Sequence, residues 1–196
     1  IQNEKAEEIA KYIFELVKQY NIPPYSEENQ TGKIRHIVIK IGIRTNEVMC
    51  VVVTNEKKIE REDELVNNII NKFPEVKTVI KNINNKNTNV ILGKENIILY
   101  GSGYIFDKLG NYKFKISPQS FYQINPSQTE ILYNTAINSI IKDKENLKDK
   151  VALDLYCGIG TIGIFVAKYF KKIYGIEIVE QAIEDAKENA KINQIE

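Results

Sequence analysis

The chain has 196 residues, 43% of them hydrophobic, which is enough for one packed core or two small ones. Its 27 basic residues nearly balance 26 acidic ones, so net charge identifies no polyanion-binding surface. The two cysteines lack metal-ligand spacing and no apolar run is long enough to span a bilayer, which excludes a metal site and a membrane anchor here and favours a reduced, cytoplasmic protein.

Residues 1–116 carry alternating helical and strand patterns. Apolar side chains at helical spacing predict two helices, and β-rich runs bounded by turn residues predict strands. The helices are expected at 1–20 and 65–73, and the strands at 34–43, 48–54, 76–83, 96–100, 104–107 and 112–116. The first two strands read as a hairpin. We therefore expect one α+β domain over residues 1–116.

Residues 117–196 predict a second domain of another kind. Ser127 and Glu130 form a capping-box pattern at the start of a helix that runs to about residue 141. A strand, a helix, a strand and a helix follow, at 151–156, 161–170, 172–178 and 179–193. This β-α-β-α order is the first half of a Rossmann-like α/β fold. The missing initial Met and the stop where another strand is expected suggest an excised fragment.

The link between the first of these strands and its helix predicts a nucleoside site. Gly158, Gly160 and Gly163 give a G-x-G-x-x-G pattern, and Glu177 closes the next strand, where a carboxylate can accept hydrogen bonds from ribose hydroxyls. Asp154 lies just upstream, where it would repel the pyrophosphate of a dinucleotide. S-adenosylmethionine brings a sulfonium and an ammonium instead, so we expect a methyltransferase. A structural alternative remains, with the glycines forming a turn and Asp154 capping the helix.

Three segments together resemble the RNA uracil-5-methyltransferase family, whose members make 5-methyluridine in transfer or ribosomal RNA. They are Ser117-Pro-x-Ser-Phe-Tyr-Gln-x-Asn125, Leu153-Asp-Leu-Tyr-Cys-Gly-x-Gly-Thr161 and Tyr174-Gly-Ile-Glu177 with Ala182, Ala186 and Asn189. The resemblance implies that S-adenosylmethionine is contacted by Gln123, Tyr156 and Glu177, in a pocket shaped by Gly158 and Gly160. The charge argument adds Asp154 to these cofactor residues.

Each proposed cofactor residue also has a structural interpretation. Gln123 could pin the linker to the Rossmann half, Tyr156 could pack in the core, and Glu177 could cap the following helix. Cys157 sits in the cofactor loop and Cys50 in an apolar strand, so we expect packing rather than catalysis from both.

The resemblance also implies a mechanism. In this family a cysteine thiolate adds to carbon 6 of uracil, carbon 5 takes the methyl group, and a carboxylate base then removes the carbon 5 proton. Both groups are expected beyond Glu196, so we assign no catalytic residue here and expect this fragment alone to be inactive. An iron–sulfur cluster is possible in the full-length protein, outside this chain.

The substrate implied by the resemblance is RNA, with ribosomal RNA favoured over transfer RNA, and no obligatory protein partner is evident. Residues 1–116 are a possible RNA contact, and Arg35 with His36 could contribute to it, although a structural role is the simpler expectation for this histidine. Two rival hypotheses stay open. One is a Rossmann-like methyltransferase with a non-RNA substrate, and the other is a module that binds RNA or cofactor without turnover.

Overall fold

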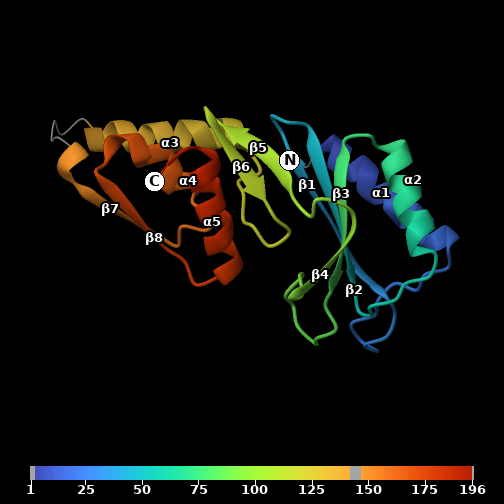
Figure 1. Cartoon of the computed structure of the whole chain (residues 1–196). Coiled ribbons are helices and arrows are strands. Elements are labelled where there is room, and N and C mark those ends of the chain that lie inside the picture. The colour runs from blue at the N-terminus through green and yellow to red at the C-terminus, as the bar shows by residue number, and fades with distance from the viewer. Residues whose placement is uncertain (1–2, 142–146, 196) are drawn as a thin grey trace. The chain divides into compact units, whose positions relative to one another are not determined.

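The structure, a computed structural model, describes residues 3–141 and 147–195 (Figure 1). It divides into two compact units. The first unit comprises Ile1–Gly42 and Asn46–Ile105, and the second comprises Ile43–Thr45 and Phe106–Glu196. Within the described ranges, no helix is both long and apolar enough to cross a membrane.

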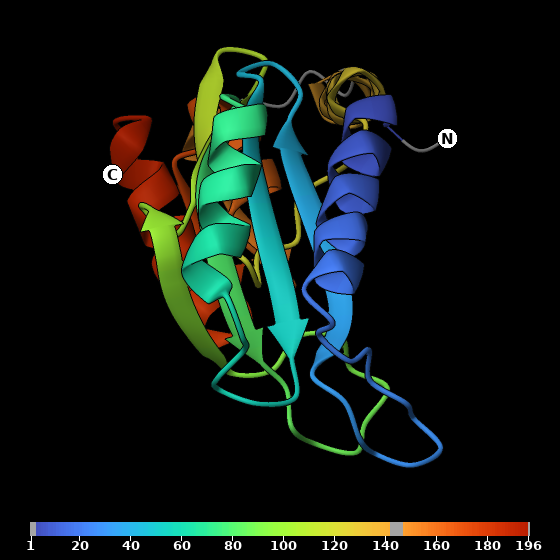
Figure 2. The same ribbon diagram turned by 90° about the vertical axis from the view of Figure 1, so that its right-hand side faces the viewer.

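The first unit is a four-stranded sheet with two helices on one face (Figure 2). Its elements are α1 Glu4–Gln19, β1 Ile34–Gly42, β2 Glu47–Thr54, α2 Glu62–Lys72, β3 Val76–Ile83 and β4 Glu95–Gly101. The strands lie in the order β1-β2-β3-β4, and β1 and β2 form the predicted antiparallel hairpin. The pairing of β2 with β3 is parallel, which requires a crossover connection, and α2 provides it.

The core of the first unit follows from the two periodicities of its elements. Alternate β2 residues Val48, Cys50 and Val52 face the helices, because successive strand side chains point to opposite faces. The apolar stripes of α1 and α2 cover them, with Ile9 and Ile69 fully buried. The start of α1 is stabilised by a helix cap, since the Asn3 side chain accepts hydrogen bonds from two first-turn amides.

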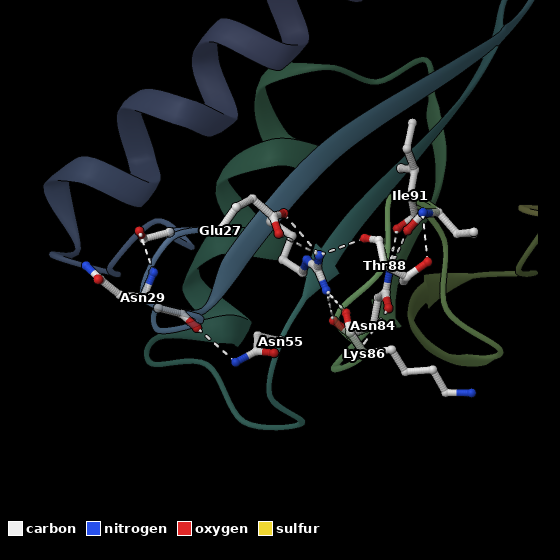
Figure 3. Close-up of polar contacts among 11 residues, drawn as sticks. Glu27, Asn29, Asn55, Asn84, Lys86, Thr88 and Ile91 are labelled. Atoms are coloured by element: carbon white, nitrogen blue, oxygen red, sulfur yellow. Dashed lines mark hydrogen bonds and ion pairs between the residues drawn. The ribbon is translucent and has the colours of Figure 1, made fainter.

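A buried arginine organises the loops at one end of this sheet. The side chain of Arg35 is only 1% exposed, and it pairs with Glu27 at 3.0 Å. Its guanidinium also donates to the carbonyl oxygens of Asn84 at 2.9 Å, Lys86 at 2.7 Å and Thr88 at 3.3 Å (Figure 3). These bonds occupy the arginine within its own unit, so the sequence hypothesis of a direct RNA contact by Arg35 is wrong for this conformation.

We expect Arg35→Met to lower the free energy of unfolding by about 3 kcal/mol, because it leaves several inward carbonyls without a donor. Chemical denaturation monitored by circular dichroism measures the change. Arg61→Met is the control, because that guanidinium is exposed, pairs with Glu64 three residues along the chain and lies over the ring of Tyr20, but holds no loop carbonyls in the described ranges. Equal stability of the two variants would contradict the scaffold role of Arg35.

The second unit contains a hairpin-like pair of strands and a β-α-β-α segment. Its elements are β5 Ile105–Leu109, β6 Tyr112–Ile116, α3 Pro126–Ile141, β7 Val151–Leu155, α4 Thr161–Val166, β8 Lys172–Ile176 and α5 Glu180–Ile192. Two short 3₁₀ turns, Leu147–Asp149 and Ala167–Tyr169, precede β7 and β8. The strands β7 and β8 pair in parallel, so the predicted Rossmann-like α/β half is confirmed.

The predicted capping box at Ser127 and Glu130 is wrong. The helix α3 begins at Pro126, and Asn125 caps it by accepting from the amide of Gln128 at 3.2 Å. Proline suits the first helical position because it has no amide hydrogen to satisfy. Glu130 instead accepts a hydrogen bond from the Gly110 amide, at 2.9 Å.

The two compact units change over between Ile105 and Phe106, so the β5–β6 pair belongs to the second unit. The reason lies in its contacts, because Leu109 and Phe114 share a buried cluster with Tyr133 and Phe165. The division into domains 1–116 and 117–196 that the sequence indicates stays a prediction.

Candidate cofactor-binding site

The loop between β7 and α4 has a backbone that turns sharply. Tyr156, Gly158 and Gly160 have φ angles of 60°, 53° and 79°, in the left-handed region. A side chain at position 160 would also lie 3.3 Å from Cβ of Ala186, so glycine there allows α5 to approach the loop. The ring of Tyr156 is 88% exposed, which contradicts the alternative that it packs in the core.

Glu177 ties the end of β8 to this loop. One carboxylate oxygen accepts from the Gly158 amide at 3.1 Å, and the other accepts from Ile178 at 2.8 Å and Val179 at 3.0 Å. These three amides hold the pKa of Glu177 below its ordinary value, against a smaller opposing effect of desolvation. A carboxylate has about four acceptor positions, so about one remains for a ligand hydroxyl. The interpretation of Glu177 as a cap is thus compatible with cofactor contact.

Asp154 lies behind the same loop. Its Oδ2 accepts from the Gly163 amide at 2.9 Å, which supplies the cap that Gly160 lacks a side chain to provide. Burial raises the pKa of Asp154, and the Gly163 hydrogen bond opposes that shift. No donor among residues 3–141 and 147–195 reaches Oδ1, so this oxygen remains as an acceptor. Asp154 therefore does cap the helix, as the structural alternative proposed, but this cap leaves its Oδ1 available to a ligand.

Both cysteines have environments that disfavour the thiolate. Cys157 packs against Gly175, where an added Cβ would lie 2.9 Å from its sulfur. Burial, followed by the charges of Asp154 and Glu177, raises the pKa of Cys157. Burial raises the pKa of Cys50 to about 12. These environments suit packing rather than nucleophilic chemistry, because the thiolate is the reactive form.

The segment that carries Gln123 is fixed at both of its ends. At its start, the hydroxyls of Ser117 and Ser120 donate to one oxygen of buried Asp185 on α5, at 2.6 and 2.8 Å. At its end, Asn125 caps α3. Gln123 itself is exposed and hydrogen-bonds to no residue in the described ranges, so the alternative that it pins the linker has no such bond to support it.

The sequence reasoning missed the polar face by which α5 docks on β6. Asn189 accepts from the Lys115 amide at 2.7 Å and donates to its carbonyl at 3.3 Å. Asn193 repeats this pattern on Lys113, at 2.9 and 2.7 Å. Four helical residues rise about 6 Å and two strand residues about 6.7 Å, so the two spacings match. These side chains thus replace a neighbouring strand along β6.

Asn189 also reaches the glycine loop. Its amide nitrogen donates to the Ile159 carbonyl at 3.2 Å, between the two glycines. The side chain is fully buried, and its bond to the Ile159 carbonyl is buried as well, so that bond is shielded from water. The motif residues Ala186 and Asn189 therefore bring α5 against the loop, and Asn189 also links it to β6.

One face of the β7–β8 pair is apolar and exposed. Its side chains are Val151, Leu153, Leu155, Tyr174 and Ile176, which the parallel register places on the same side. The other face holds the half-buried Asp154 and Ile173. Both faces of a doubly wound parallel sheet are normally covered by helices.

The described residues offer no metal site. In residues 3–141 and 147–195, no three His, Cys, Asp or Glu side chains are grouped to hold a metal ion.

A parallel β-α-β with a glycine loop and an acidic residue ending the second strand is the first half of a Rossmann-like fold. The solved structure that it resembles, described below, makes this the fold of an S-adenosylmethionine-dependent methyltransferase. A family model described as tRNA (uracil-5-)-methyltransferase matches residues 11–196. The chain belongs to this family.

Known proteins agree with that assignment. RNA methyltransferases of Oceanobacillus iheyensis and Clostridium tetani, both named as uncharacterized, are each 44% identical and cover 98% and 100% of this chain. The chain spans 41% and 42% of their lengths. The crystal structure of Pyrococcus abyssi tRNA (uracil-54, C5)-methyltransferase in complex with S-adenosyl-L-homocysteine is 26% identical, with a TM-score of 0.75. It matches 96% of this chain over 44% of its own.

Proposed function

We propose that the protein carrying this chain transfers a methyl group from S-adenosylmethionine to carbon 5 of a uridine in RNA, and that this chain forms the cofactor-binding part. The observation that carries the proposal is the family match over residues 11–196, which includes the whole glycine loop and Glu177. S-adenosylmethionine, when bound, supplies the electrophilic methyl group.

The donor set of the loop suits this cofactor. Glu177 has an acceptor position left for a ribose hydroxyl, and Oδ1 of Asp154 offers a negative atom to a cationic ligand. Tyr156 and Gln123 present exposed side chains for further contacts, and Gly158 and Gly160 keep the loop surface free of side chains. The nucleophile and base of the family mechanism are proposed to lie beyond Glu196, so this chain alone is expected to bind cofactor without transferring the methyl group.

The proposed RNA is ribosomal, with transfer RNA as the alternative. The protein carrying this chain is incubated with methyl-labelled S-adenosylmethionine and either purified ribosomal RNA or transfer RNA, and the nucleosides are then analysed by mass spectrometry. We expect label in 5-methyluridine from ribosomal RNA. Label in transfer RNA alone would move the assignment to that substrate, and methylation of a non-RNA substrate instead would refute the proposal.

Calorimetry on the chain tests its cofactor assignment separately. We expect binding of S-adenosylhomocysteine and no binding of NAD, because Asp154 would repel a pyrophosphate at this loop. Binding of NAD alone would refute the interpretation of Asp154. Binding of S-adenosylhomocysteine by the parent protein without turnover on any substrate would favour the non-catalytic module.

A further inference from the structure

A cavity of about 480 Å³ lies in the first unit, between the loop 84–95 and Lys57. Its volume is within the range of about 300–1,000 Å³ that is typical of ligand sites. The lining combines charged residues with the amide of Asn84 and the apolar side chain of Val90. Neither the glycine loop nor Glu177 belongs to it, so the cofactor proposal leaves this cavity without a role.

The charged lining is predominantly basic. Lys57, Lys86 and Lys94 contribute three positive charges, and Glu95 contributes one negative charge. Lys57 pairs with Glu95 at 2.7 Å, whereas the ion pairs of the described ranges include neither Lys86 nor Lys94. Two lysine charges at this cavity are therefore uncompensated, which favours an anionic ligand.

The backbone of the loop is arranged to suit an anion. A carbonyl oxygen would repel a phosphate, but seven carbonyl groups of residues 84–95 accept hydrogen bonds from side chains of the protein. Arg35 donates to the carbonyls of 84, 86 and 88, and the Asn84 side chain donates to those of 90 and 91 (Figure 3). The Asn82 side chain donates to the carbonyls of 93 and 95. These acceptors are therefore occupied, while Lys86 and Lys94 are exposed.

The same bonds make the loop a fixed platform. Asn82 also accepts from the Gly93 amide at 2.6 Å, so its side chain holds the loop through both amide atoms. In Figure 3 the Lys86 side chain extends away from the bonded network while its carbonyl points into it. A lysine on a fixed backbone loses less freedom when it binds a phosphate than one on an unrestrained loop.

We propose that this cavity binds the phosphate backbone of the substrate RNA through Lys86 and Lys94, with Val90 offering apolar contact to an adjoining sugar or base. The inference rests on the proposed RNA function and adds to it a contact in the first unit. Phosphate contacts position a nucleic acid without reading its sequence, so this site contributes affinity and orientation.

The test is filter binding of radiolabelled ribosomal RNA to the protein carrying this chain, measured across a series of salt concentrations. In the double variant Lys86→Gln, Lys94→Gln we expect about tenfold weaker binding at low salt, and a dependence on log salt that is shallower by about 1 to 2. Because both side chains are exposed, the fold is retained, and unchanged S-adenosylhomocysteine binding verifies this.

Two controls accompany the double variant. Lys11→Gln, Lys18→Gln removes the same charge from the exposed surface of α1 and is expected to leave the salt dependence near that of the wild type. Lys86→Arg, Lys94→Arg keeps the charge and is expected to keep the affinity. An equal loss of RNA affinity in the Lys11→Gln, Lys18→Gln variant would mean that only the net charge of the protein matters, and it would overturn the proposed site.

The remaining outcomes separate this proposal from the proposed function. Wild-type RNA binding that the double variant retains in full would overturn the cavity site alone. No RNA binding by the wild type, with S-adenosylhomocysteine still bound, would refute the RNA function and this inference with it. Uridine monophosphate that displaces the RNA at concentrations near its own binding constant would assign the cavity to free nucleotides instead. RNA containing 4-thiouridine should crosslink to the peptide 84–95, and crosslinks confined to other peptides would contradict the proposal.

Discussion

Replacing Asn189 with alanine is expected to lower the free energy of unfolding by about 2–4 kcal/mol and to weaken S-adenosylhomocysteine binding. The stability loss follows from three hydrogen bonds of a fully buried side chain, two to Lys115 and one to the Ile159 carbonyl. Alanine leaves an amide and a carbonyl of Lys115 and the Ile159 carbonyl without this partner. The affinity loss follows because Ile159 lies between the two glycines of the cofactor loop.

Asn193→Ala is a matched control for this prediction. It removes the same pair of bonds from Lys113, at the more exposed end of the same helix. Asn193 also donates to the Asn189 carbonyl, but within residues 3–141 and 147–195 its side chain makes no bond to the glycine loop, so we expect a smaller stability loss and unchanged affinity. Thermal denaturation compares the stabilities, and calorimetry at a temperature where the variants remain folded compares the affinities. Equal effects of the two variants on affinity would show that Asn189 acts only as a general anchor of α5.

The sequence predicted the elements of the second unit well because their apolar residues recur at strand or helix spacing. That spacing is present in 151–155, 172–176 and 180–192, although neither β7 nor β8 contains a buried residue, and the glycine pattern marks the turn between β7 and α4. The local start of α3 was predicted wrongly. Two residue patterns competed there, and Asn125 before Pro126 is a stronger start than a serine inside the helix.

The contacts that support the site could not be predicted in the same way. Asn189 and Lys115 are 74 residues apart, and an asparagine in a polar helical sequence normally faces solvent. Arg35 presents the same difficulty, since three of its partners are backbone carbonyl groups, which no side-chain pattern identifies. The one available signal was that Asn189 belongs to the family motif, and this did not indicate which residues its side chain would contact.

Glu177→Ala is expected to weaken S-adenosylhomocysteine binding by about tenfold, as for the loss of a charged hydrogen-bond acceptor. Glu180→Ala is the matched control, because it removes a negative charge from the first turn of α5 without touching the glycine loop. Calorimetry on folded protein measures both variants. A loss of stability with unchanged affinity in Glu177→Ala would show that Glu177 only caps the following helix and does not contact the cofactor.

The pH dependence supplies an independent test of the same carboxylate. The amides of Gly158, Ile178 and Val179 lower the pKa of Glu177 in the folded protein, so its contribution is complete above the ordinary glutamate pKa. It is lost only as the pH falls through the lowered value. Burial shifts the pKa of Asp154 in the opposite direction, upward. Protonation of either carboxylate should weaken binding on acidification, and Glu177→Ala should remove the Glu177 part of this pH dependence while it leaves the Asp154 part.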